Sequence, residues 1–312
     1  MTRNARTKIG LALGSGSARG WAHIGVINTL EELGIKPDIV CGTSIGALVG
    51  GMYVTNNLEK LHQWLLTLDK KQILKLLDVN LLTGGGFIEG KYLIDFFNKH
   101  MGNHSIEELE TTFVSIATNL SNGQEIWIKD GSINDAIRCS MALPGLFTPV
   151  EKENTWLVDG GLVNPVPVST CRAMGATKVI AVNLNGDILG KHLNHISNHT
   201  QPQPQHIFNK LTEETVLSRF TDSVTGKANS LFSELFNYDA KQPGIFDVLA
   251  SSINIMQDRI TRSRMAGDPP DIILAPKLAH IGLMEFDRAE EAIESGRKAV
   301  LQLQPLLEEL YE

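Results

Sequence analysis

The sequence predicts an α/β fold with a largely parallel central sheet, and three observations support this prediction. The first 185 residues alternate short apolar runs with segments of helical period, which is the pattern of repeated strand-helix-strand units. The apolar runs are almost uninterrupted, as expected for strands covered on both faces. The chain has 312 residues, of which 42% are hydrophobic and 20% charged, so it can bury a large core.

The expected elements follow one another along the chain. Helices are expected from about Gly20 and from Ile45, and the turn dipeptide Asn122-Gly123 is expected to join two strands as a hairpin. The expected strands are KIGLAL (8–13), DIVCG (38–42), FVSIATNL (113–120), EIWIK (125–129), WLVDG (156–160) and KVIAVNL (178–184).

The composition changes near residue 185. Residues 185–250 are rich in His, Asn, Gln and Pro, and we interpret them as a polar excursion or lid. Helical spacing then predicts a helix over 245–265, a strand in PPDIILAP (269–276) and one terminal amphipathic helix over 286–311. We therefore expect a single domain over 1–312, with catalytic motifs in 9–184, the excursion in 185–250 and a helical and strand part in 251–312.

Composition and charge exclude several classes of function. A net charge of −7 and a pI near 5.7 argue against a nucleic-acid partner. The first ten residues lack the apolar core of a secretory signal and no run of eighteen apolar residues occurs, so we expect a soluble cytoplasmic protein. Cys41, Cys139 and Cys171 lack the spacing of metal ligands, so we expect reduced core thiols and neither a metal site nor a disulfide.

The stretch CGTSIGALVGG predicts a nucleophile elbow. Ser44 lies between Gly42 and Gly46, directly after an apolar strand and before a helix. A nucleophilic serine at such a strained turn requires glycines because flanking side chains would collide. The alternative is an ordinary helix cap formed by Ser44.

A glycine-rich turn, GSGSARG, follows the first strand. Its backbone amides predict a site for an anion at the start of a helix. A phosphate or dinucleotide cradle is disfavoured, because Arg19 stands where the sixth position of that fingerprint needs glycine. A tight strand-to-helix turn without any ligand is the other interpretation.

A serine nucleophile needs a base, and the sequence offers two candidates. Asp159 ends an apolar strand in TWLVDGG, where a buried carboxylate is costly without a partner or a task, although an Asp-Gly turn would explain it too. His280 follows a strand and gives the chain order Ser44, Asp159, His280 of a Ser-His-Asp hydrolase. Packing or solvation explains the remaining histidines better: His23, His62, His100, His104, His192, His195, His199 and His206.

The segment SINDAIRCSMALPGLFTPV is predicted to be structural. It has the pattern of a short helix that ends near Pro144 and leads toward the strand of Asp159. Ser140 lacks the flanking glycines of an elbow, so we expect it to shape a pocket wall and not to act as a nucleophile.

Taken together, GSGSARG, GTSIG and DGG resemble the patatin-like phospholipase family over Ile9 to Leu184. The resemblance is to the bacterial cytoplasmic branch and, more distantly, to the neuropathy target esterase domain. It implies a three-layer α/β/α fold and a lipid acyl hydrolase of the phospholipase A or lysophospholipase type. It further implies a Ser-Asp dyad that works without a histidine, a cofactor or a metal.

The resemblance assigns roles by position. It implies that Ser44 is the nucleophile, that Asp159 is the base and that Arg19 orients the glycine-rich loop. The oxyanion-hole amides would come from Gly14, Ser15 and Gly16, with Ser17 in the same loop. The family commonly has glycines where this chain has Ser15 and Ser17, and a serine restricts positive φ.

The partner expected from the resemblance is a lipid or another acyl ester. Transient contact with a membrane surface is one interpretation of the apolar residues in the polar excursion, and packing onto the domain is the other. A binding or regulatory module with the same fold, and a nucleotide-binding protein, are the remaining alternatives. The apolar residues in question are Phe208, Leu211, Leu217, Phe220, Leu231, Phe232, Leu235 and Phe236.

Overall fold

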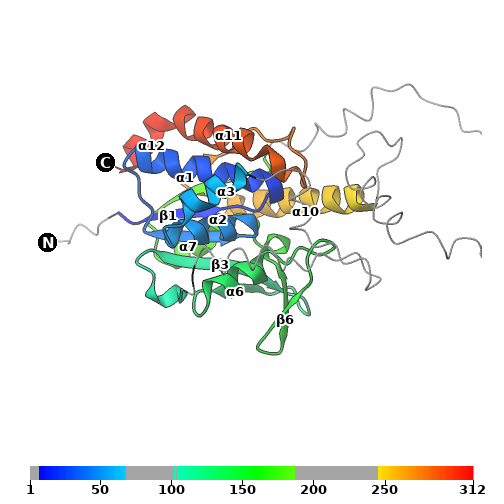
Figure 1. Cartoon of the computed structure of the whole chain (residues 1–312). Helices are drawn as coiled ribbons and strands as arrows, with labels where there is room; N and C mark the ends of the chain where they lie inside the picture. The colour runs from blue at the N-terminus through cyan, green and yellow to red at the C-terminus, as the bar shows by residue number, and fades with distance from the viewer. Residues whose placement is uncertain (1–6, 68–101, 103, 187–244, 312) are drawn as a thin grey trace, which may run out of the picture.

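The computed structural model describes residues 7–67, 102, 104–186 and 245–311 (Figure 1). Most of the predicted polar excursion and all eight of its apolar candidates lie outside the described residues. So do five of the nine histidines: His100, His192, His195, His199 and His206.

The described residues form one sheet of eight strands, and the prediction of a largely parallel α/β fold is confirmed. Their pairing order is β5-β6-β3-β2-β1-β7-β8, with β4 also on β3. The pairs within β3-β2-β1-β7-β8 are parallel, whereas β4, β5 and β6 pair antiparallel. The strands are β1 (Ile9–Leu13), β2 (Ile39–Thr43), β3 (Thr112–Asn119), β4 (Glu125–Ile128), β5 (Val150–Lys152), β6 (Thr155–Asp159), β7 (Lys178–Val182) and β8 (Ile272–Leu274).

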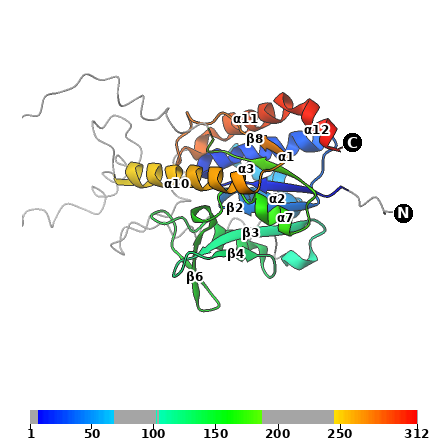
Figure 2. The same ribbon diagram turned by 180° about the vertical axis from the view of Figure 1, so that it is seen from behind.

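Helices cover both faces of this sheet. In Figure 2 the long helix α10 runs across the face opposite to α1 and α2. The described helices are α1 (Ala22–Glu32), α2 (Ile45–Val54), α3 (Leu58–Leu65), α6 (Ile133–Ser140), α7 (Val168–Ala173), α10 (Ile245–Gly267), α11 (Ala289–Gln302) and α12 (Gln304–Tyr311), with 3-10 turns η1 (Ser17–Trp21), η3 (Ile106–Glu108), η4 (Gly160–Leu162) and η5 (Phe286–Arg288).

The prediction of one continuous terminal helix over 286–311 is wrong. The chain forms η5, then α11 and α12, with a break at Leu303. Pro305 explains the break, because it has no N–H to donate and its ring would clash with a carbonyl one turn earlier in a continuous helix. Within the first turn of a new helix the same proline is tolerated.

Successive residues of the buried strands face two cores. Leu11 and Leu13 pack in the core that contains α1, α2 and α11, while Ala12 between them packs with α7 and with Met265 of α10. The period of two is that of strands buried on both faces, and the result is a three-layer α/β/α arrangement. The three cysteines are buried free thiols, as predicted.

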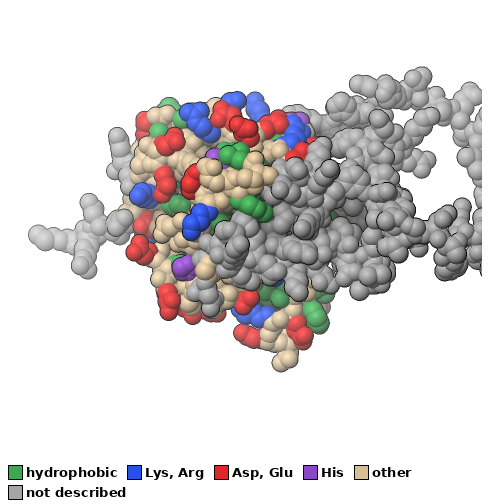
Figure 3. All heavy atoms as spheres, viewed as in Figure 1, with side chains coloured by type: hydrophobic (Ala, Val, Ile, Leu, Met, Phe, Trp, Pro, Cys, Tyr) green, Lys and Arg blue, Asp and Glu red, His purple; other side chains and the backbone are tan. Residues whose placement is uncertain are grey.

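The described surface in one view of the molecule is mixed in charge (Figure 3). On the face seen in Figure 3, acidic and basic side chains are interspersed over the described residues. None of the described helices combines the length and apolar character that a bilayer-spanning helix needs.

Strand β3 brings two distant parts of the chain together. One edge of β3 is taken by β4 along Ser115 to Thr118. The other edge is shared, because β2 pairs with it as far as Thr43 opposite Ile116, and β6 takes over with Asp159 opposite Ala117. The end of β2 and the end of β6 therefore meet, which is where the elbow and the acidic motif lie.

Candidate active site

Ser44 occupies a strained turn between β2 and α2. Its backbone angles are φ 57° and ψ −123°, a region that side-chain-bearing residues rarely adopt. A Cβ at Gly42 would lie 2.5 Å from the backbone of Ala47, and one at Gly46 would lie 2.2 Å from the carbonyl oxygen of Leu13. A side chain on either side of the serine would therefore collide with backbone atoms.

A second serine holds this turn. The backbone N–H of Ser44 donates to Ser140 Oγ at 2.8 Å, and Ser140 Oγ in turn donates to the carbonyl of Ile116 at 2.6 Å. Ser140 is fully buried. It therefore has the structural role expected from the sequence, but its contact with the elbow was not predicted.

The carboxylate of Asp159 contacts the hydroxyl of Ser44. Ser44 Oγ donates to Asp159 Oδ2 at 2.5 Å across 115 residues of sequence. The second carboxylate oxygen, Oδ1, accepts from the N–H of Gly161 at 2.7 Å. Burial raises the pKa of Asp159 to about 6, although the hydrogen bonds from Ser44 and Gly161 act in the opposite direction. The aspartate is thus a stronger base than an exposed one.

The two glycines after Asp159 are needed for different contacts. A Cβ at Gly160 would lie 2.2 Å from the carbonyl oxygen of Ile116, so the backbone of β3 approaches there. A Cβ at Gly161 would lie 2.4 Å from the side-chain nitrogen of Gln257 on α10. Gly160 thus admits the backbone of β3, and Gly161 admits a side chain of α10.

The glycine-rich loop after β1 presents fewer free amides than expected. The N–H of Gly14 donates to the carbonyl of Val182 at 3.1 Å, and that of Ser15 donates to the carbonyl of Pro165 at 2.9 Å. These two amides are therefore not available to an anion in this conformation, contrary to expectation. The amides of Gly16 and Ser17 donate to no other described residue.

Of the two serines that replace glycine, one has the conformation that glycine favours. Ser17 has φ 51°, whereas Ser15 is not among the residues with positive φ. Ser17 Oγ donates to the carbonyl of Leu283 at 2.6 Å, and the next N–H, that of Ala18, donates to the same carbonyl. These bonds offset the strain of the left-handed backbone.

Arg19 and His23 hold the loop in place. Arg19 is 1% exposed, and its Nε and its backbone N–H both donate to the carbonyl of Gly16 at 3.2 Å. Because the carbonyl and N–H of one peptide point in opposite directions, this bond turns the amide of Ser17 away from Arg19. His23 Nε2 lies 2.8 Å from the carbonyl of Gly14, and because a carbonyl only accepts, this nitrogen carries the hydrogen.

The contact of His23 with the carbonyl of Gly14 was not predicted from the sequence. Burial lowers the pKa of His23 to about 4, so the ring is neutral near pH 7. The only signal in the sequence is its position on the helix that follows the loop, and that position is equally typical of a packed histidine.

The rival histidine, His280, is engaged elsewhere. Its Nε2 lies 2.6 Å from Glu291 Oε1 of α11, and its side chain is 51% exposed. Within the described part of the chain, no histidine ring hydrogen-bonds to Ser44 or Asp159.

Comparison with known proteins places this geometry in a family. The model of the patatin-like phospholipase family matches residues 11–172, a range that holds the loop, the elbow and the acidic motif. An uncharacterised NTE family protein of Mycobacterium bovis is 31% identical over 95% of this chain and 91% of its own length. The chain therefore belongs to the patatin-like phospholipase family. A patatin-like protein of this kind is a lipid ester hydrolase, and a lipid is its class of substrate.

Other patatin-like relatives differ in how much of their length is shared. A second NTE family protein, from Mycobacterium tuberculosis, is 29% identical over 97% of this chain but only 48% of its own length. The protein named lysophospholipase nte1 of Emericella nidulans is 34% identical over 56% of this chain and 12% of its own. The solved structure of VipD from Legionella pneumophila aligns with a TM-score of 0.45 at 12% identity, over 97% of this chain and 67% of VipD.

Proposed function

We propose that this protein hydrolyses carboxylic esters of lipids with Ser44 as nucleophile and Asp159 as general base. The observation that carries the proposal is the hydrogen bond of 2.5 Å between Ser44 Oγ and a carboxylate that is 0% exposed. A base must lie within hydrogen-bond reach of the proton it removes, and Asp159 does so directly.

In the first half of the reaction, Ser44 Oγ attacks the ester carbonyl carbon and its proton passes to Asp159 Oδ2. The tetrahedral intermediate then expels the alcohol, which takes that proton, and an acyl group remains on Ser44. In the second half, Asp159 takes a proton from water, the water oxygen attacks the acyl carbon, and the proton returns to Ser44 as the fatty acid leaves.

The negative oxygen of the intermediate needs hydrogen-bond donors. We assign this role to the amides of Gly16 and Ser17, which donate to no other residue that the structure describes and beside which Arg19 holds the loop. The N-terminus of α2, which starts directly after Ser44, favours negative charge at the same place. In other serine hydrolases, loss of one such donor costs about 2.7–4 kcal/mol of transition-state stabilisation.

The raised pKa of Asp159 suits this task. With a pKa of about 6, the carboxylate is ionised at neutral pH. It is nevertheless more basic than an exposed aspartate, because burial disfavours its charge. The acid form would be a poor acceptor of the serine proton, so activity should rise with pH through this value.

The type of ester is proposed from the relatives. We propose a phospholipase A or lysophospholipase type of cleavage, because a relative bears the name lysophospholipase. Transient contact with a lipid surface and a cytoplasmic location belong to this proposal. Parallel assays with a lysophospholipid and the matching diacyl phospholipid, each followed by release of free fatty acid, would separate the two types.

The dyad is tested by three variants assayed with a short p-nitrophenyl ester and a fluorophosphonate probe. Ser44→Ala should abolish hydrolysis and labelling, and Asp159→Asn should nearly abolish both. His280→Ala, in which the bond to Glu291 is lost, should retain both. Circular dichroism controls for folding. Loss of activity in folded His280→Ala, with Asp159→Asn still active, would favour a Ser-His-Asp triad and refute the dyad.

A further inference from the structure

Helix α10 reaches the glycine-rich loop through two polar side chains. Gln257 Oε1 accepts from Ser15 Oγ at 2.9 Å, a contact across 242 residues of sequence, and also from Asn185 Nδ2 at 3.1 Å. Asn254, one helical turn earlier, accepts from Arg19 Nη2 at 3.0 Å through its Oδ1. Both contacts are to residues of the loop whose amides are proposed to bind the oxyanion.

Gln257 is an unusual residue to bury. It is 5% exposed, and its neighbours on the outer side of the helix, such as Met256, are exposed. A buried amide is costly unless it is hydrogen-bonded, so this position is stabilised by its contact with the loop and Asn185. A residue selected for packing alone would be apolar there.

Gln257 also lies beside the carboxylate of the dyad. The point where a Cβ of Gly161 would stand is 2.4 Å from Gln257 Nε2 and 2.9 Å from Asp159 Oδ1. One side chain of α10 thus touches the loop with its oxygen and adjoins the base with its nitrogen. The missing side chain of Gly161 is what allows this approach.

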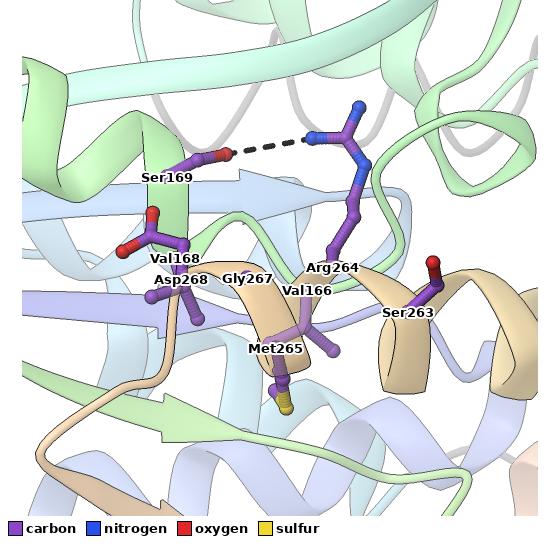
Figure 4. A pocket seen from close by; sticks show the side chains of 8 residues that line it. All are labelled: Val166, Val168, Ser169, Ser263, Arg264, Met265, Gly267 and Asp268. Carbon is purple, nitrogen blue, oxygen red and sulfur yellow. Dashed lines mark hydrogen bonds between the residues drawn. The ribbon is translucent and has the colours of Figure 1, made fainter.

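The other end of α10 is fixed to the sheet. Arg264 pairs with Glu125 at the start of β4 at 2.6 Å and lies 3.5 Å from Ser169 Oγ of α7 (Figure 4). A cavity of about 280 Å³ lies beside this pair, and neither Ser44 nor Asp159 lines it. The cavity therefore marks the anchor of the helix and not the site of the dyad.

From these contacts we propose that Asn254 and Gln257 are positioning residues for ester hydrolysis, which set the glycine-rich loop from α10 so that the amides of Gly16 and Ser17 face the oxyanion. The inference rests on the proposed function for its chemistry. Asn254 acts through Arg19 and Gln257 through Ser15, so neither residue needs to touch the substrate.

Kinetics with a short p-nitrophenyl ester provide the first test. Gln257→Met, which is similar in shape but accepts only a weak hydrogen bond, should lower kcat about tenfold with little change in KM, as should Asn254→Leu. Asn254→Asp keeps an acceptor for Arg19 and should restore most of kcat. Ser252→Ala, an exposed position on the same helix, is the matched control and should match wild type. Wild-type kcat in both Gln257→Met and Asn254→Leu would overturn the proposal.

The pH profile provides a reading that a purely structural role would not change. Gln257→Glu keeps an acceptor for Ser15 but adds a negative charge beside Asp159, so the acid limb of kcat/KM should move to higher pH. The other charged side chains of this region have partners of their own: Arg19 donates to Asn254, Asp258 pairs with Arg262, and Arg264 pairs with Glu125. An unmoved acid limb in Gln257→Glu would contradict the placement of Gln257 next to the base.

Hydrogen exchange separates this inference from the proposed function. In a Ser44→Ala background, Gln257→Met and Asn254→Leu should speed amide exchange in the peptide that covers residues 14–20, and Ser252→Ala should not. Amide exchange is measured without turnover, so it tests whether Asn254 and Gln257 position the loop even if the wild-type protein proves inactive toward the ester. Unchanged exchange in both variants would overturn the inference, whereas an inactive wild type would overturn only the proposed function.

Discussion

Two strand-to-helix turns lie side by side at the ends of β1 and β2, and they are stabilised in different ways. The elbow holds Ser44 at φ 57°, and the glycine-rich loop holds Ser17 at φ 51°. In the elbow, the strained conformation is possible because Gly42 and Gly46 have no side chains. In the loop, it is held by hydrogen bonds that Arg19 and His23 donate to loop carbonyls and by bonds that the side chains of α10 accept from Ser15 and Arg19.

The two turns should therefore respond differently to substitution. A methyl group added to the elbow meets backbone atoms, which cannot move aside without disturbing the sheet. Removal of one hydrogen bond from the loop leaves the others in place, so the loss should be partial. Substitutions that add a side chain to the elbow are therefore expected to abolish activity. Substitutions that remove one hydrogen bond from the loop are expected to reduce activity only in part.

The largest effect is expected from Gly46→Ala. Its Cβ would lie 2.2 Å from the carbonyl oxygen of Leu13, so the elbow must shift. We expect no detectable ester hydrolysis and a loss of about 2–3 kcal/mol in the free energy of unfolding, measured by urea denaturation. Gly267→Ala is the control, because nothing lies within 4 Å of its Cβ and it should leave both quantities unchanged. A Gly46→Ala protein with wild-type kcat would contradict the steric account.

A smaller but clear effect is expected from Arg19→Lys. Lysine keeps the charge but lacks the Nε that donates to Gly16 and the planar fork that reaches Asn254. We expect kcat to fall about 10²-fold with KM changed much less, as when a donor of an oxyanion hole is misplaced. A kcat within twofold of wild type would show that Arg19 does not set the loop.

Asp159→Asn is expected to stabilise the fold while it removes activity. The pKa of Asp159 is raised from 3.8 to about 6 in the folded state. The contribution of this group to the free energy of unfolding is therefore fully present below about pH 4, and it is lost as the pH rises through 6. Asparagine carries no charge to bury, so the variant should gain about 1–3 kcal/mol above pH 7. Denaturation curves at pH 8 and pH 4 should show a gain that shrinks at the lower pH.

The buried ring of His23 changes the free energy of unfolding with pH in the opposite direction to Asp159. The wild type and Asp159→Asn must therefore be compared at a pH where His23 does not titrate. Its pKa is lowered to about 4 by burial, so its contribution is lost as pH falls from about 6.5 toward 4. Above pH 7 the ring is neutral in both folded and unfolded states and does not interfere. An Asp159→Asn variant less stable than wild type at pH 8 would contradict the assigned pKa shift.

The smallest effect is expected from Ser17→Gly. Glycine relieves the left-handed φ, which costs a serine about 1 kcal/mol, but loses the bond to the carbonyl of Leu283, worth a similar amount. Unfolding free energy should therefore stay within about 0.5 kcal/mol of wild type. Ser17→Ala keeps the strain and loses the bond, so it should be the less stable of the two; the reverse order in denaturation would show that the strain is not offset as described.

The elements and the elbow could be predicted because their signals are local. The apolar runs predicted seven of the eight strands in the described residues, and among these strands only the short β5 was not anticipated. Ser44 between two glycines, and Asp159 before two more, are patterns of adjacent residues. Their meeting depends on the shared edge of β3, which no local pattern contains and which the family resemblance alone implied.

The support of the loop could not be predicted because its partners are distant and ordinary in sequence. Gln257 lies in a stretch of helical period that contains no motif. In the sequence, Ser140 and His23 look like ordinary core residues. Which amides are free depends on carbonyls from Val182 and Pro165, which the sequence does not connect with the loop. By contrast, the break of the terminal helix at Leu303, which was also missed, could have been predicted from the nearby Pro305.

The most direct test of the account is the pH dependence of inactivation by a fluorophosphonate probe. For the wild type and for His280→Ala, the rate of covalent labelling of Ser44 should rise with pH along one limb whose midpoint lies near the pKa of about 6 of Asp159. Asp159→Asn should lose the limb together with nearly all of the rate. A limb that disappears in His280→Ala, or that persists at the wild-type rate in Asp159→Asn, would contradict direct deprotonation of the serine by this aspartate.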